Sequence, residues 1–134
     1  MRYIIRDHDK AKFEAKKMLM TNIIKQFNER YDNRFSLTIT DQYYNMAEKV
    51  EPVMHIVELA REAIQNVGLE PITRPIRGGT DGSRLSFMGL PCPNIFAGGL
   101  NFHSRFEYVP LESMEAATKT IIEIARLMAT RTWD

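Results

Sequence analysis

A helical stripe of apolar residues is the feature that most limits what this chain can fold into. Apolar side chains recur at i, i+3 and i+4 between Val53 and Val67, the spacing that places them on one face of an amphipathic helix. Pro52 suits the first turn of such a helix, and Gly68 supplies the left-handed residue that commonly ends one. An amphipathic helix must bury its stripe against another element, so the sequence predicts a packed domain around this helix.

The sequence before this stripe predicts a β-α-β unit. Tyr3–Ile5 is a short β-type run, and a helical pattern from Phe13 to Phe27 follows Asp9, which with Asp7 is a candidate helix cap. Apolar and polar residues then alternate from Phe35 to Ile39, the pattern of a half-buried strand. Two strands and one helix are a small set on which to close a core, so something outside the sequence is expected to complete this piece.

The sequence after the stripe predicts helices that separate strands. A strand is expected at 72–76, although Pro75 interrupts it, followed by a short helix at 83–88, a second strand at 94–97 and a last helix soon after Pro110. Strands that helices separate are most simply parallel. The predicted fold class is therefore α/β, with a boundary between two pieces near Glu51–Pro52.

Composition excludes several classes of protein. The chain has 134 residues, 44% of them apolar, enough for the core of one ordinary domain. A formal charge of +1 gives no field that would attract nucleic acid, and no apolar run is long enough for a membrane span. The first apolar run is too short for a signal peptide. Because the single Cys92 cannot form an internal disulfide, the cytoplasm is the expected compartment.

A glycine-rich loop at 77–82 is the first candidate site. Gly78 and Gly79 leave backbone amides open to a carboxylate or phosphate, and Arg77 can add a bidentate contact. The loop lacks the lysine and the spacing of a phosphate-binding P-loop. A plain turn between a strand and a helix is the competing interpretation, and simple anion binding is a third.

His103 is the candidate metal ligand. It lies in the loop 101–107, beyond the end of a predicted strand, where α/β proteins build their sites, and imidazole is the commonest metal ligand. A solvated histidine is the competing interpretation. Glu107 is either a hydrogen-bond partner of His103 or a surface carboxylate. We expect Tyr43–Asn45 to pack between the two pieces, and Cys92, with no base beside it, to be an inert thiol.

Four stretches of the chain carry a resemblance to a known family. They are 41–46, 51–56, 75–82 and 85–94, and residues 101–103 and 107–114 extend them. On these stretches the chain resembles the C-terminal portion of the peptidase T family, the tripeptide aminopeptidases among the dinuclear zinc peptidases related to aminoacylase and carboxypeptidase G. The resemblance covers nearly the whole chain.

The resemblance implies a division of the chain and roles for its site residues. Residues 1–49 resemble the second half of a ferredoxin-like lid and dimerisation domain, and residues 50–134 the second half of a catalytic domain that holds two zinc ions. His103 matches the last metal ligand of that domain. A segment at its substrate-binding end is matched by Arg77, Gly78, Gly79 and Thr80. The family's other ligands and its general base are absent from this chain.

The expected function is that of one part of a zinc-dependent aminopeptidase that releases the N-terminal residue from tripeptides. One ligand without a base neither fixes a zinc ion nor activates water, so the chain alone is expected to be inactive. The expected partners are the tripeptide in the intact protein and a second copy through the lid piece. The alternative is a non-enzymatic α/β module that pairs with itself or with a complementary half through an exposed strand edge.

Overall fold

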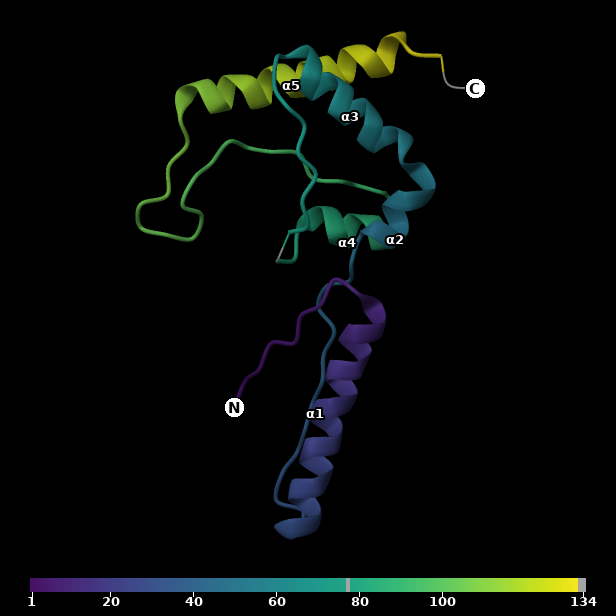
Figure 1. The fold of residues 1–134 in the computed structure, drawn as a ribbon, viewed down its shortest axis with the longest axis vertical. Helices are drawn as coiled ribbons and strands as arrows, with labels where there is room; N and C mark the ends of the chain where they lie inside the picture. Colours follow the sequence, from purple (N-terminus) through teal and green to yellow (C-terminus); the bar gives the residue numbers. More distant parts are fainter. Residues whose placement is uncertain (77, 133–134) are drawn as a thin grey trace.

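The computed structural model describes residues 1–76 and 78–132, and most of its regular structure is helical. Figure 1 shows α1 with extended segments beside it at one end of the molecule, and α2 to α5 gathered at the other. The elements are α1 (Lys10–Arg30), α2 (Ala47–Val50), the 3-10 helix η1 (Glu51–Val53), α3 (His55–Asn66), α4 (Asp81–Phe87) and α5 (Leu111–Thr130). Among the described residues, no helix has the length and apolar character that a membrane span requires.

Helix α1 forms where local sequence signals place it. Asp9 caps the helix, because the backbone N–H of Lys12 donates to its carboxylate at 2.8 Å. After the helix, Asp32 and Asn33 adopt left-handed φ values of 52° and 55° and reverse the chain. The side chain of Asn28 then holds the returning segment through two hydrogen bonds of 2.8 Å to the backbone of residue 35. The predicted cap and helix are confirmed.

The segments predicted as strands are extended but unpaired. Within the described residues, the only β pairing is an antiparallel bridge between Leu100 and Tyr108. No strand is assigned at 3–5, 35–39, 72–76 or 94–97. An extended segment without a neighbour presents unpaired N–H and C=O groups. The α/β class, and the division into a lid half and a catalytic half at residues 49 and 50, therefore stay predictions.

The core lies where α3 packs against α5. Leu59, Ala63 and Leu127 are buried in one cluster. This contact lies at one edge of the predicted stripe of α3. Ala63 of the stripe is buried beside Leu59, which the prediction did not include, whereas Val57 and Ile64 of the stripe are only half-buried. Part of the apolar face of α3 is therefore left uncovered.

The core is small for the mass of the chain. The accessible surface is 10997 Å², whereas a folded monomer of this mass exposes about 7,200 Å². Within the described part of the chain, the buried apolar side chains are Val50, Leu59, Ala63 and Leu127. Large apolar side chains are exposed on α1, α4 and α5 alike. The helices therefore carry more apolar surface than the described residues cover.

A polar joint connects α1 to the segment that leads into α2. The carboxylate of Asp41 accepts hydrogen bonds from Lys17 at 3.1 Å and from the hydroxyl of Tyr44 at 3.0 Å. These two donors, Lys17 first, lower the pKa of Asp41. The side chain of Asn45 also donates to the carbonyl oxygen of His8 at 3.0 Å. Residues 41–45 are thus tied to α1 before the chain enters the other part of the molecule.

A second polar contact joins α5 to α3. The carboxylate of Glu123 accepts a hydrogen bond from the amide of Asn66 at 2.7 Å and two from Arg126 at 2.6 and 2.7 Å. These contacts, that of Arg126 first, lower the pKa of Glu123 to about 2. The ionised form of Glu123 is therefore favoured by folding.

We expect Glu123→Gln to lower the melting temperature at neutral pH and to have little effect in acid. Because the folded pKa lies below the ordinary value of 4.5, the carboxylate stabilises the fold above that value, and this contribution is lost as the pH falls toward about 2. Thermal unfolding followed by circular dichroism across this range measures the effect. Glu115→Gln is the control, since its contact with Lys119 is exposed. A difference that stays constant down to the lowest pH would contradict the prediction.

Candidate functional site

The described part of the glycine-rich loop leads directly into α4. Thr80 is the N-cap residue, and its side-chain oxygen accepts a hydrogen bond from the backbone N–H of Ser83 at 3.1 Å and from the amide of Asn94 at 3.2 Å. This geometry is that of a turn between an extended segment and a helix, the competing interpretation of the loop. Arg77 lies outside the described residues. The predicted contact of Gly78, Gly79 and Thr80 with a substrate stays a prediction.

The two glycines of this loop have different surroundings. A Cβ atom on Gly79 would lie 2.2 Å from two ring carbons of Tyr43, well inside van der Waals contact. Nothing lies within 4 Å of a Cβ atom on Gly78. The ring of Tyr44 also lies 5.4 Å from that of Phe87 on α4. Tyr43 and Tyr44 therefore pack against the 78–80 turn and α4, and Gly79 is the residue that admits the Tyr43 ring.

Helix α4 is held by a face of small buried residues. The hydroxyl of Ser83 donates to the carbonyl oxygen of Tyr44 at 2.7 Å, and the hydroxyl oxygen of Ser86 accepts from the backbone N–H of Cys92 at 2.9 Å. A Cβ atom on Gly82 would lie 2.4 Å from the carbonyl oxygen of Cys92. The sequence interpretation missed these contacts. The signal was the spacing of Gly82, Ser83 and Ser86, which puts three small residues on one side of a short helix.

His103 is exposed on a closed loop. The loop is closed by two backbone hydrogen bonds between Leu100 and Tyr108, of 2.8 and 3.2 Å. His103 has a left-handed φ of 65°, and its backbone N–H donates to the carboxylate of Glu107 at 2.9 Å. Glu107 therefore contacts His103 through the main chain and shapes the loop from which the imidazole projects.

The described residues bring no set of metal ligands together. In residues 1–76 and 78–132, no group of three or more His, Cys, Asp or Glu side chains could hold a metal ion. Zinc sites use three or four protein ligands, and His103 offers one imidazole while Glu107 is bonded to the backbone. In Figure 1 the green loop around residue 103 projects away from the 78–80 turn. The residues present do not by themselves fit a zinc site.

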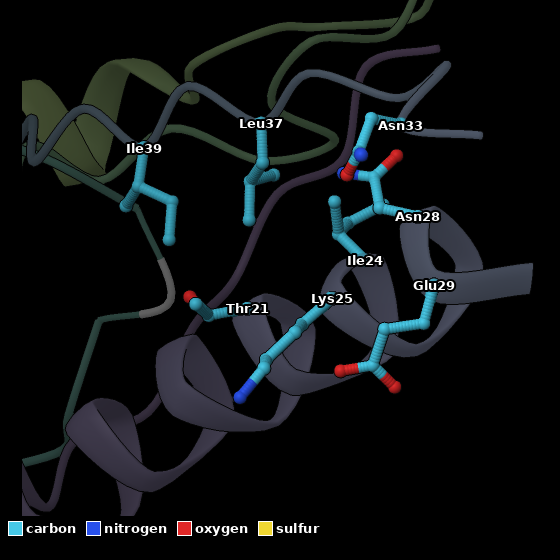
Figure 2. A pocket seen from close by; sticks show the side chains of 8 residues that line it. All are labelled: Thr21, Ile24, Lys25, Asn28, Glu29, Asn33, Leu37 and Ile39. Atoms are coloured by element: carbon cyan, nitrogen blue, oxygen red, sulfur yellow. The ribbon is translucent and has the colours of Figure 1, made fainter.

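A groove of about 670 Å³ lies elsewhere, between α1 and the segment that returns along it (Figure 2). Figure 2 shows Leu37 and Ile39 of the returning segment pointing toward Thr21 and Ile24 of α1. The groove is lined by Thr21, Ile24, Lys25, Asn28, Glu29, Asn33, Leu37 and Ile39. None of these is a predicted site residue. No strand is assigned to the returning segment, so it lies along α1 without being held in a sheet.

Comparison with known proteins gives one consistent result. No family model matches the chain. Peptidase T from Parabacteroides distasonis is 59% identical over 127 residues, which are 95% of this chain and 31% of that protein. Peptidase T from Alkaliphilus oremlandii is 60% identical over 93% of this chain and 31% of its own length. Peptidase T from Exiguobacterium sp. is 55% identical over 98% of this chain and 32% of its own length. The resemblance to peptidase T is confirmed.

The chain spans about a third of the length of these peptidase T relatives, with 31% or 32% of each covered. The remaining two-thirds of each relative has no counterpart in the 134 residues. The similarity therefore extends over nearly all of this chain without assigning a complete active site to it.

Proposed function

We propose that this chain is one part of a zinc-dependent aminopeptidase that releases the N-terminal residue from tripeptides. The observation that carries the proposal is the identity of 55–60% to three proteins named peptidase T over at least 93% of the chain. The chain alone is catalytically incomplete, because one imidazole neither fixes a zinc ion nor supplies a general base.

Within that peptidase, His103 is one metal ligand. Its imidazole is exposed on a loop that the Leu100–Tyr108 bridge closes and the Glu107 carboxylate braces. A ligand held on a braced loop loses little freedom when it binds a metal, so this loop suits a site whose other ligands come from elsewhere. The two zinc ions of the proposed site belong to the intact protein.

The loop at 77–80 holds the substrate in the same proposal. A tripeptide ends in a carboxylate, and backbone amides beside glycines, together with a guanidinium, suit such an anion. The open space around Gly78 supports this role, because nothing lies within 4 Å of the position of a Cβ atom. Thr80 is engaged as the cap of α4, so we assign it to positioning the loop that carries Arg77, Gly78 and Gly79.

The compartment and the oligomeric state of the intact protein are also part of the proposal. The intact protein is cytoplasmic, supported by the single cysteine, and forms a homodimer through residues 1–49. A second candidate function is a non-enzymatic module that pairs with itself or with a partner. The unpaired extended segments favour it, since Ile4 is 72% exposed and Ile39 is 40% exposed.

A chimera tests the proposed function. This chain would replace the matching segment of the Parabacteroides distasonis peptidase T, and release of the N-terminal residue from an unblocked tripeptide would be measured with added zinc. We expect the chimera to be active and His103→Ala within it to reduce turnover by at least about 100-fold, because even residues that only support metal ligands are worth 10- to 100-fold. His8→Ala is the control, because His8 accepts a hydrogen bond from Asn45 through its backbone carbonyl oxygen, which the substitution keeps.

The isolated chain is assayed beside the chimera and should show no turnover. Activity of the isolated chain that His103→Ala abolishes would mean that the chain, or an assembly of its copies, completes a site. A folded but inactive chimera, or one in which His103→Ala keeps full activity, would refute the proposed role of the chain.

A further inference from the structure

Tyr43 and Tyr44 are adjacent in the chain, but their hydroxyl groups have different surroundings. The hydroxyl of Tyr44 donates to the carboxylate of Asp41 at 3.0 Å, and its ring lies 5.4 Å from that of Phe87. The hydroxyl of Tyr43 has no hydrogen-bond partner within residues 1–76 and 78–132, and Tyr43 is 43% exposed. Contacts within the chain therefore account for the ring and the hydroxyl of Tyr44, but only for the ring of Tyr43.

The backbone after Tyr43 is held in place by side chains. The hydroxyl of Ser83, which is buried, donates to the carbonyl oxygen of Tyr44 at 2.7 Å. The side chain of Asn45 donates to the carbonyl oxygen of His8 at 3.0 Å. A tyrosine side chain has only two rotatable bonds, so a ring on a fixed backbone loses little conformational entropy when it contacts a ligand.

The ring of Tyr43 places its hydroxyl beside the glycine-rich loop. A Cβ atom on Gly79 would clash with the Cδ2 and Cε2 carbons of this ring. Cε2 is bonded to the carbon that bears the hydroxyl, so the hydroxyl lies next to the same loop. Among the described residues, nothing lies within 4 Å of a Cβ atom on Gly78. The loop thus has room for a ligand at one glycine and the phenol of Tyr43 at the next.

A phenol hydroxyl suits the carboxylate at the end of a peptide. It can donate one hydrogen bond, and a hydrogen bond to a carboxylate is stronger than one between two neutral groups. The loop at 77–80 is proposed to hold this carboxylate through backbone amides and a guanidinium. The hydroxyl of Tyr43 adds a donor from a different segment of the chain.

We propose that Tyr43 is a substrate-binding residue whose hydroxyl donates a hydrogen bond to the C-terminal carboxylate of the tripeptide. This inference rests on the proposed function for the identity of the substrate. Tyr44 holds the segment in place, whereas Tyr43 recognises the end of the peptide. A peptide with a blocked C-terminus lacks the charge that strengthens this bond, so Tyr43 contributes to a preference for unblocked peptides.

The test compares Tyr43→Phe with Tyr44→Phe in the single-chain chimera, since each substitution removes one hydroxyl and keeps the ring. Tyr43→Phe should raise KM for an unblocked tripeptide by at least about 10-fold, the effect of losing a hydrogen bond to a charged group. It should leave kcat within about 2-fold, because the contact is made equally in the ground state and the transition state. The melting temperature of the isolated chain should stay within about 1 °C.

Tyr44→Phe is the matched control and should show the opposite pattern. It loses the hydrogen bond to Asp41, so the melting temperature of the isolated chain should fall by about 3 °C. KM in the chimera should stay within about 2-fold, since the bond from Ser83 and the ring contact with Phe87 do not involve the lost hydroxyl.

A tripeptide amide distinguishes a contact with the carboxylate from a general effect on binding. The amide keeps the three side chains and lacks the terminal charge. The loss caused by Tyr43→Phe should therefore shrink from about 10-fold to below about 3-fold. If the amide is hydrolysed too slowly, its inhibition constant against the unblocked tripeptide replaces KM. An equal loss for both peptides would place the hydroxyl against another part of the substrate and overturn the proposal.

Failure of this inference can be told from failure of the proposed function. An active chimera in which Tyr43→Phe leaves KM unchanged, or in which Tyr44→Phe raises it equally, refutes the role of Tyr43 and keeps the activity. A folded chimera that hydrolyses no tripeptide counts against the activity, and calorimetric titration with the same two peptides then tests the contact. Weaker binding of the unblocked tripeptide in Tyr43→Phe alone would support it, and equal binding, or none, would refute it.

Discussion

Leu59→Ala is expected to abolish the cooperative thermal unfolding of this chain. Leu59 is 2% exposed and lies at the centre of the cluster it forms with Ala63 and Leu127. Removing a buried leucine side chain costs about 2 to 5 kcal/mol, and ordinary domains have only about 5 to 15 kcal/mol of net stability. A chain with so small a core is expected to have a smaller free energy of unfolding than that, so the loss removes most of it. Far-UV circular dichroism during heating would then show a gradual loss of helix in place of a transition.

Leu19→Ala is the matched control for this experiment. The same atoms are removed from α1, where Leu19 is 59% exposed, and changes at exposed positions usually stay within about 0.5 kcal/mol. The control should therefore melt like the unmodified chain. If Leu59→Ala also left the melting curve unchanged, the α3–α5 contact would not be the unit that unfolds cooperatively.

The helices could be predicted because their signals are local. Asp9 caps α1 through a residue three positions along the chain, and Pro110 immediately precedes α5. Such signals need no information about distant segments. The detailed packing was not accessible in this way. Leu59 is buried because α5 approaches α3 from one side of the stripe, and no spacing within α3 indicates where another helix lies.

The strands depend on partners that the sequence does not identify. Residues 35–39 alternate as a half-buried strand does, yet they lie beside α1 without a neighbouring strand. The alternation of side chains indicates which face of a strand is to be buried. The backbone N–H and C=O groups of that strand, however, can be paired only by another strand. The pattern is consistent with a layer that the described residues lack, and this is the same conclusion that the exposed apolar surface gives.

In the candidate site, too, local features could be predicted from the sequence and contacts between distant residues could not. The position of His103 on a loop after an extended segment follows from the glycines and polar residues around it. The contact of Glu107 with the backbone of residue 103 could not be told from a contact with the imidazole, because both fit a spacing of four residues. The contact between Tyr43 and Gly79 joins positions far apart in the sequence, so only the structure shows it.

That contact leads to a large expected difference between two neighbouring substitutions. Gly79→Ala should destabilise the chain by about 1 to 3 kcal/mol, the range for overpacking, because its Cβ would lie 2.2 Å from the ring of Tyr43. Gly78→Ala should change little, since nothing lies within 4 Å of the added atom. Thermal unfolding measures both. The rate of chymotrypsin cleavage after Tyr43 gives a local measurement, and it should rise in Gly79→Ala alone.

A second substitution separates the ring contact from a general effect on the backbone. Once Tyr43→Ala has removed the ring, Gly79→Ala should cost much less than it does in the unmodified chain, and the two changes should be strongly non-additive. A loss that persists without the ring would place the strain in the loop backbone. Tyr43 belongs to the segment tied to α1, and Gly79 to the loop proposed to hold the substrate. Strong non-additivity would therefore mean that a shift of α1 changes the position of that loop.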